Sequence, residues 1–282
     1  MSEGFGENLK LAFDQFGHLC VGIDPHPFLL KEWGFEDKSS DVREFSLRVI
    51  DACAGSVGII KPQVAFFERY GSRGYEALEY IMERARKAGI LVIADAKRGD
   101  IGSTMEAYAQ SWLASGVALE ADALTVSPYL GVGALEQTVD IALANNKGLF
   151  ILAATSNPEA AVLQSAQATG WGNGTNTVAA EVLHSIAQWS TQRTPSNSVG
   201  AVLGATLDLP GLGIDPAVYP SIPVLAPGFG FQGARVEDAK SKFGPLAQNL
   251  IVAETRSVLS AGREGIAEAI KRRVDEVGSA LG

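Results

Sequence analysis

Cysteine and histidine are scarce in this chain of 282 residues, which contains two cysteines and three histidines. Cys20 and Cys53 lie in apolar stretches, so we expect two buried thiols in a reducing compartment, not a disulfide framework. His18, His26 and His184 are widely separated, and the acidic residues show no spacing typical of a metal site. We therefore predict a protein that holds no metal, and of the three histidines only His26 is expected near a functional site.

Long apolar runs and an excess of positive charge are also missing. No uncharged stretch approaches the roughly 18 to 20 residues that a membrane-spanning helix needs. The segment 1–14 has no apolar run with a cleavage site, so we expect no signal peptide and a cytoplasmic location. The formal net charge of −9 argues against a nucleic-acid partner, because no basic surface is available to displace counterions. An anionic substrate would have to be bound by local groups.

The chain does contain a regular alternation of short apolar runs and longer amphipathic ones. Most short runs are continuous Val, Ile, Leu and Ala, which is typical of parallel strands covered on both faces. The stretches between them have apolar residues at helical spacing. The predicted strands are 19–24, 59–65, 90–96, 123–127, 148–155, 200–206, 224–228 and 250–254, and the predicted helices are 41–54, 74–88, 103–115, 135–145, 176–189 and 263–277.

Eight strands that alternate with helices predict an α/β fold, a single closed (β/α)8 barrel of the TIM type, which usually has about 250 residues. A doubly wound open sheet is the alternative, but it would show a glycine-rich turn after the first strand, where this chain has Ile23 to Pro27. We expect one catalytic domain over residues 1–282 with a helical extension at 1–18. The long loop 156–175 contains a candidate lid at 160–174, and we expect the Gly- and Pro-rich segment 206–220 to replace a regular sixth helix.

The end of the third strand is the most informative part of the sequence, because a barrel of this kind carries its site at the carboxyl ends of the strands. Asp95 and Lys97 are two residues apart, so both side chains are expected to project into the barrel interior, beside Lys61 of the second strand. Asp100 follows, and residues 103–106 show a capping-box pattern that would start the next helix. Burying such charges side by side is unfavourable unless they are paired, so the cluster predicts catalysis. The alternative is a buried ion pair next to an acidic helix entry.

The seventh and eighth strands end in residues suited to a phosphate group. Gly228, Gly230 and Gly233 leave backbone N–H groups free to approach an anion, and we expect this segment to lead into a helix N-terminus. Arg256 can hold two phosphate oxygens at once, and Gln232 stands between the glycines. Phosphate sites after strands seven and eight recur in this fold. The pattern therefore predicts a small phosphorylated substrate.

Residues 95–104, Asp-Ala-Lys-Arg-Gly-Asp-Ile-Gly-Ser-Thr, resemble the D-x-K-x-x-D-I-x-x-T signature of the orotidine 5′-monophosphate decarboxylase family. The likeness extends from Asp24 to Arg256 and is strongest to the subgroup of longer bacterial chains, type 2. It implies a barrel enzyme that converts orotidine 5′-monophosphate to UMP and CO₂, the last step of pyrimidine biosynthesis de novo. It also implies that no metal or organic cofactor is used.

The resemblance implies a role for each matching residue. Asp24 and Lys61 would hold ribose hydroxyls, and Ser156 would bind the edge of the pyrimidine, although Asn157-Pro158-Glu159 after it departs from the glycine-containing turn of many members. Gln232 and Arg256 would hold the phosphate. The expected catalytic residues are Lys97, Asp95, Asp100 and Lys61, and the expected substrate-binding residues are Asp24, Ile101, Thr104, Ser156, Pro227, Gly228, Gly230, Gln232, Gly233 and Arg256.

The resemblance also implies a homodimer with sites shared across the interface, because Asp100, Ile101 and Thr104 would reach into the site of the partner subunit. Loss of CO₂ from C6 leaves a vinylic carbanion, and the ammonium of Lys97 would stabilise it and donate the proton. Asp95 would lie near the substrate carboxylate. Its repulsion either strains the ground state or disappears in the transition state, and the sequence favours neither.

Two alternative functions remain at this point. A magnesium-dependent sugar-phosphate decarboxylase or aldolase of related barrels shares the D-x-K-x-x-D motif, but it holds its metal on acidic residues of the early strands, where Lys61 would repel Mg²⁺. A non-catalytic barrel that binds nucleotides would bind UMP without turnover, and it would gain nothing from the buried charges. Turnover that is unaffected by a chelator would exclude both.

Overall fold

The computed structural model describes residues 4–170, 176–192, 197–219 and 222–282. Its centre is a closed barrel in which eight parallel strands pair in chain order and β1 pairs with β8. The strands are β1 Leu19–Ile23, β2 Ile59–Pro62, β3 Leu91–Arg98, β4 Ala123–Val126, β5 Gly148–Ala154, β6 Val199–Leu203, β7 Val224–Pro227 and β8 Leu250–Glu254. The predicted (β/α)8 barrel is confirmed, and each predicted strand overlaps its observed counterpart.

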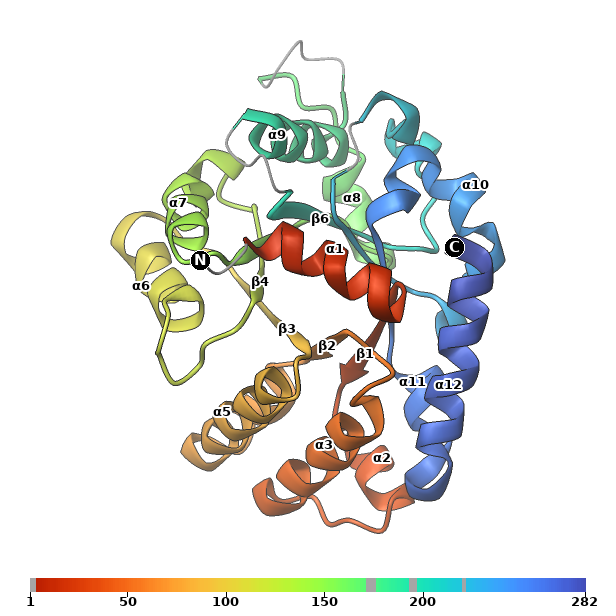
Figure 1. The fold of residues 1–282 in the computed structure, drawn as a ribbon. Coiled ribbons are helices and arrows are strands. Elements are labelled where there is room, and N and C mark those ends of the chain that lie inside the picture. Colours follow the sequence, from red (N-terminus) through yellow and green to blue (C-terminus); the bar gives the residue numbers. More distant parts are fainter. Residues whose placement is uncertain (1–3, 171–175, 193–196, 220–221) are drawn as a thin grey trace.

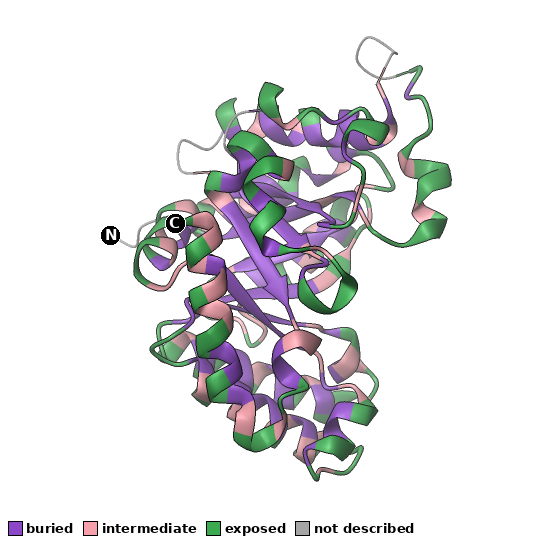
Figure 2. Cartoon of the chain, turned by 90° about the vertical axis from the view of Figure 1, so that its right-hand side faces the viewer, coloured by how far each residue is buried: buried purple, intermediate pink, exposed green. Residues whose placement is uncertain are grey.

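Helices surround the barrel, as Figure 1 shows. They are α1 Phe5–Phe16, α2 Pro27–Glu32, α3 Ser39–Cys53, α4 Ala65–Glu68, α5 Ser72–Lys87, α6 Gly102–Leu113, α7 Glu136–Ala144, α8 Ala161–Gln164, α9 Val178–Gln192, α10 Ala239–Phe243, α11 Arg256–Leu259 and α12 Gly262–Leu281. The apolar spacing noted in the sequence places one face of each long helix against the strands; α5, for example, buries Leu78 and Ile81. The burial colouring of Figure 2 shows buried strands at the centre and exposed outer helix faces.

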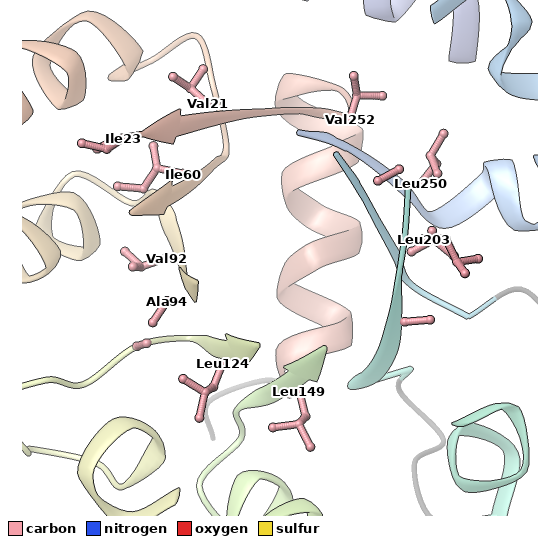
Figure 3. Packing of buried hydrophobic residues seen from close by; sticks show 14 of the residues in the cluster. Val21, Ile23, Ile60, Val92, Ala94, Leu124, Leu149, Leu203, Leu250 and Val252 are labelled. Atoms are coloured by element: carbon pink, nitrogen blue, oxygen red, sulfur yellow. The ribbon is translucent and has the colours of Figure 1, made fainter. Parts of the chain in front are cut away.

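The side chains of each strand alternate between two separate hydrophobic cores. Outward-pointing residues such as Ile60 meet the helices, and Figure 3 shows them projecting away from the barrel centre. Inward-pointing residues such as Ile59 and Ile93 form a smaller core inside the barrel. Lys61 and Asp95 each stand two positions after one of these inward residues, so the strand period directs their side chains to the inside of the barrel at its carboxyl end.

Helix α1 closes the opposite, amino-terminal end of the barrel. Phe5, Leu9 and Ala12 of this helix are buried against the inner core. The ring of Phe5 meets that of Phe150 edge-on, with centroids 5.9 Å apart. Gly148 at the start of β5 makes room for this contact, because a Cβ there would lie 2.3 Å from the Phe5 ring. In the views of Figures 1 and 3, α1 lies over the centre of the barrel.

Two connections differ from regular βα units. Between β6 and β7 the described residues form two short 3₁₀ turns, Pro210–Leu212 and Pro216–Val218, so the expected replacement of a regular helix is confirmed. Between β5 and α9 the chain forms a 3₁₀ turn at Pro158–Ala160 and then the short helix α8. The lid role of 160–174 stays a prediction, and Trp171 to Gly174 lie outside the described residues.

The predicted capping box at 103–106 is wrong. Helix α6 begins at Gly102 with Ile101 as its N-cap residue, two residues before Ser103, the N-cap that the pattern indicated. Glu106 does not turn back to the helix start; its carboxylate accepts hydrogen bonds from the amides of Gln110 and Gln137 at 3.0 and 3.1 Å. The backbone after β3 reaches the helical conformation through Gly102, whose φ is +53°.

The two cysteines are free and fully buried, as predicted. Burial raises the pKa of the Cys20 thiol to about 12, so this thiol stays protonated. Within the ranges that the structure describes, no helix combines the length and the apolar character needed to cross a membrane.

Candidate active site

A polar cavity opens at the carboxyl ends of the strands and has two lobes. The first, of about 280 Å³, lies at the ends of β1, β7 and β8. The second, of about 220 Å³, reaches the ends of β4, β5 and β6. Lys61, Asp95, Pro227 and Gln232 line both lobes. The cavity is therefore continuous around the end of β3, where the sequence predicted the site.

Asp95 lies at the centre of the charged cluster. Its Oδ2 accepts a hydrogen bond from Lys61 Nζ at 2.8 Å, and its Oδ1 accepts from Lys97 Nζ at 2.6 Å and from the Thr125 hydroxyl at 2.9 Å. The side chains of Lys61 and Asp95 are each only 9% exposed, whereas that of Lys97 is 44% exposed. Lys97 is thus the member of the cluster whose ammonium can meet a ligand in the second lobe.

The buried pair is held in its ionised form. Burial alone raises the pKa of Asp95, but the ammonium groups of Lys61 and Lys97 outweigh it and hold this pKa well below its usual range. Burial likewise lowers the pKa of Lys61, and the carboxylates of Asp95 and Asp24 more than reverse this, so the pKa of Lys61 is raised. Both charges are therefore present at neutral pH.

The backbone at Lys97 departs from a regular strand. Its φ is +48°, in the left-handed region that side chains with a Cβ rarely adopt. The pairing of β3 with β4 shifts register between Ala94 and Arg98. The Lys97 N–H donates to Thr125 Oγ1 at 3.0 Å, which fixes the irregular segment. Asp95 and Lys97 therefore meet as predicted, but they do so through this irregularity and not through simple strand alternation.

Asp24 follows β1 and lines the first lobe. Its Oδ1 is buried and has no hydrogen-bond partner within the described part of the chain. A buried carboxylate oxygen without a donor is unfavourable, and such atoms in native proteins call for an explanation. A ligand hydroxyl in the lobe would satisfy it, which fits the ribose contact that the resemblance implies.

The turn after β7 forms a wall of the first lobe. Gly228 and Gly230 have φ values of +116° and +65°, so this path of the chain requires glycine. Gly233 lies on the far side of the turn and lines a neighbouring cavity. The predicted helix N-terminus is wrong here, because the turn contains only a three-residue 3₁₀ segment, Gly230–Gln232, and α10 begins later, at Ala239.

Arg256 is the first residue of α11 and faces this turn. Its guanidinium carbon lies 4.0 Å from the centroid of the Phe231 ring, a cation–π contact that orients the group. Arg256, Gln232 and Gly228 all line the first lobe. A cation, an amide and backbone groups of a glycine turn are the donors that a phosphate group requires.

Ser156 is exposed and lines the second lobe, where Leu152 and Val202 supply apolar walls. The residue before it is fastened to α8. The Thr155 N–H donates to Gln164 Oε1, and Gln164 Nε2 donates to Thr155 Oγ1, both at 3.0 Å. The short helix is therefore tied to the rim of the lobe by two hydrogen bonds.

Three expected site residues, Asp100, Ile101 and Thr104, lie apart from the Lys61–Asp95–Lys97 cluster of their own chain. The Asp100 carboxylate accepts from the Ile101 N–H at 2.8 Å and is not among the described residues that line either lobe. Ile101 is 60% exposed, and Thr104 is exposed at the start of α6. Within the described part of the chain, neither Ile101 nor Thr104 lines either lobe.

Sequence reasoning missed several residues that line the cavity. Thr125 binds both Asp95 and the Lys97 backbone, and Gln63 Oε1 lies 3.5 Å from Lys97 Nζ. Strand alternation could have found both, because Gln63 stands two residues after Lys61 and Thr125 stands next to an outward residue of β4. His26, the one histidine expected near the site, does line the first lobe, and burial lowers the pKa of its imidazole.

Comparison with known families agrees with this geometry. Residues 17–271 match the model of the orotidine 5′-phosphate decarboxylase / HUMPS family. The chain belongs to this family. It is 49% identical to the orotidine 5′-phosphate decarboxylase of Streptomyces coelicolor over 92% of this chain and 91% of the relative, and 46% identical to that of Salinispora arenicola over the same shares.

Solved structures of the family have the same fold. A crystal structure from Streptomyces avermitilis, provisionally named orotidine 5′-phosphate decarboxylase, superimposes with a TM-score of 0.91 at 44% identity, over 99% of this chain and 96% of that one. The OMP decarboxylase of Leishmania donovani superimposes with a TM-score of 0.76 at 26% identity, over 99% and 98% of the two chains. The family resemblance inferred from residues 95–104 is confirmed.

Proposed function

We propose that this protein decarboxylates orotidine 5′-monophosphate to UMP and CO₂, as the last step of pyrimidine biosynthesis de novo. The observation that carries the proposal is the Lys61–Asp95–Lys97 cluster at the mouth of a family barrel, in which a buried carboxylate holds an exposed ammonium at 2.6 Å. The curated relatives at 44–49% identity bear the name of this enzyme.

The two lobes suit the two halves of the nucleotide. The glycine turn, Gln232 and Arg256 provide donors for the phosphate in the first lobe, and the unpartnered oxygen of Asp24 provides an acceptor for a ribose hydroxyl. The second lobe has apolar walls for a flat ring and Ser156 at its edge. Binding of the remote phosphate can supply free energy that orients the ring over Lys97.

Lys97 is the proposed proton donor. Decarboxylation leaves an electron pair on C6, and an ammonium held beside that carbon stabilises the developing charge and then transfers its proton. Asp95 and Lys61 keep the ammonium in place, and Asp95 faces the departing carboxylate. The chemistry needs no electron sink beyond this preorganised charge, so we propose that no metal or organic cofactor takes part.

The active form is proposed to be a homodimer in the cytoplasm. Asp100, Ile101 and Thr104 are exposed or half-buried beside the site of their own chain, and the family resemblance implies that they complete the site of the partner. A two-fold related pair would bury Ile101, which is 60% exposed in the single chain.

The test is the loss of ultraviolet absorbance when the purified protein is mixed with orotidine 5′-monophosphate in EDTA. Rapid conversion to UMP is the expected result, and it would also exclude a magnesium-dependent sugar-phosphate decarboxylase or aldolase. A folded dimer that binds UMP without converting the substrate would contradict the proposal and would favour a non-catalytic nucleotide-binding barrel.

A further inference from the structure

A buried carboxylate forms part of the wall of the proposed phosphate lobe. Glu254, the last residue of β8, lines this lobe together with Arg256, and it is only 2% exposed. Its Oε2 accepts a hydrogen bond from the hydroxyl of Ser257 on α11. A Cβ on Gly230 would lie 2.9 Å from the same oxygen, so the phosphate-binding turn rests directly against this carboxylate.

This position creates an electrostatic problem for the proposed substrate. A phosphate monoester carries close to two negative charges at neutral pH. An unpaired carboxylate in the same low-dielectric wall would repel it and would cancel the attraction of Arg256. The lobe can bind phosphate well only if the charge of Glu254 is neutralised from a side that the ligand does not occupy.

Arg273 meets this requirement from outside the cavity. It lies on α12, its side chain is 14% exposed, and its guanidinium forms an ion pair with Glu254 Oε1. The same guanidinium pairs with Glu276 one turn further along the helix. β8 directs Val252 outward, so Glu254 at the same phase of the strand points toward α12 and away from the barrel axis.

We propose that Arg273 supports phosphate binding by neutralising Glu254 behind the phosphate-binding turn. Glu254 fixes the turn at Gly230 and the start of α11 through Ser257, and the pairing with Arg273 prevents the charge of Glu254 from opposing that of Arg256. Arg273 acts through Glu254 and does not touch the substrate, so it is a positioning residue. The inference rests on the proposed function, and it extends the phosphate site to the last helix of the chain.

The test compares two single variants, which remove charges of opposite sign, with the double variant, which removes both. Arg273→Met leaves Glu254 unpaired, and we expect KM for orotidine 5′-monophosphate and Kd for UMP to rise about tenfold, with kcat nearly unchanged. Glu254→Gln removes the repulsion and keeps an acceptor for Ser257, so binding should stay equal or become tighter. The double variant should restore the KM and Kd of the parent protein.

The control for lost stability is Lys147→Met at the opposite end of the barrel. Lys147 is 7% exposed and forms an ion pair with Glu120 at 2.7 Å. This variant should lower Tm and leave KM and Kd unchanged, which separates general destabilisation from an effect on phosphate binding.

Equal weakening of UMP binding by both single variants would mean that the pair only fastens α12, and it would overturn the proposal. Unchanged KM and Kd in folded Arg273→Met would overturn it as well. If Arg273→Met does not fold, the other two variants decide, because weaker binding by either contradicts the neutralisation. A parent protein that neither converts orotidine 5′-monophosphate nor binds UMP would instead overturn the proposed function, and this inference with it.

Discussion

The two ends of the barrel are buried to a similar degree but are filled with opposite kinds of group. At the amino-terminal end, Phe5 and Leu9 of α1 are 1% and 2% exposed. At the carboxyl end, Lys61 and Asp95 are each 7% exposed. Burial of the apolar groups stabilises the fold by about 25 cal/mol for each Å² removed from water. Burial of the charges has to be offset by their mutual attraction and hydrogen bonds.

The difference teaches that stability and chemistry are assigned to separate ends of one scaffold. The apolar residues of α1 at the amino-terminal end, which we call the lower end, can change without touching the ligand lobes, since α1 contacts the beginnings of the strands. The charged cluster at the carboxyl end, which we call the upper end, holds charges that an enzyme needs and that a folded barrel alone does not. Variants at the two ends should therefore separate activity from stability.

The largest expected effect is loss of turnover on removal of the exposed ammonium at the upper end. Lys97→Ala should lower kcat by roughly 10⁴-fold or more, because both charge stabilisation and the proton donor are lost. UMP binding should remain measurable by titration calorimetry. Lys87→Ala is the matched control, since that lysine lies on α5 with a side chain 65% exposed. Full activity of Lys97→Ala would remove this residue from the mechanism.

The opposite result is expected at the lower end. Phe5→Ala should reduce the free energy of unfolding by about 3–5 kcal/mol, as is typical when a buried aromatic ring is deleted. The kcat of the folded fraction should stay unchanged. Urea unfolding and initial rates measure the two quantities, and Leu11→Ala, at a position 54% exposed on the same helix, is the control. A large loss of kcat in folded Phe5→Ala would contradict the separation of the two ends.

A smaller effect on activity is expected within the upper end, at the phosphate lobe. Arg256→Ala should lower kcat/KM by about 100-fold, since charge-assisted hydrogen bonds to the phosphate are lost. Inhibition by UMP should weaken in parallel. Arg235→Ala, where the side chain is 72% exposed near the same turn, should have almost no effect. An unchanged kcat/KM in Arg256→Ala would exclude it from the phosphate site.

The smallest expected effect is a pH dependence that only the upper end should show. The pKa of Asp95 is lowered in the folded protein, so its pairing stabilises the fold above the unfolded pKa, about 3.9, and this stability is lost as the pH falls below it. Asp95→Asn should therefore be less stable than the parent protein at pH 7, and the gap should narrow toward pH 3. The gap between Phe5→Ala and the parent should not follow this pattern. Urea unfolding at several pH values measures both.

The fold was largely predictable from the sequence because parallel strands buried on both faces leave an uninterrupted apolar pattern. The cluster at β3 was predictable for a different reason, since a charged motif is conspicuous inside such a pattern. Strand alternation places Thr125 on the inner face, but its role was not foreseen, because a single threonine in an apolar strand also fits a simple β preference. Its role arises from pairing across β3 and β4.

Other features depend on contacts that a linear pattern does not contain. The start of α6 follows from the positive φ of Gly102, which overrides the capping-box pattern at 103–106. The proposed phosphate-binding turn contains a 3₁₀ segment and does not lead directly into the predicted helix N-terminus, and Gly230 in this turn lies close against Glu254 and Ser257. The pairing of Glu254 with Arg273 joins residues 19 positions apart in sequence, and the sequence alone offered no signal for it.

The left-handed backbone of Lys97 limits how thermostable this barrel can become while it remains an enzyme. A side chain with a Cβ in that region is less stable than glycine by about 1 kcal/mol or more. Selection for heat resistance alone would favour glycine at this position, and it would discard the ammonium in the same step. Stabilising substitutions in this protein will therefore have to lie elsewhere, for example in α1 or in the outer helices.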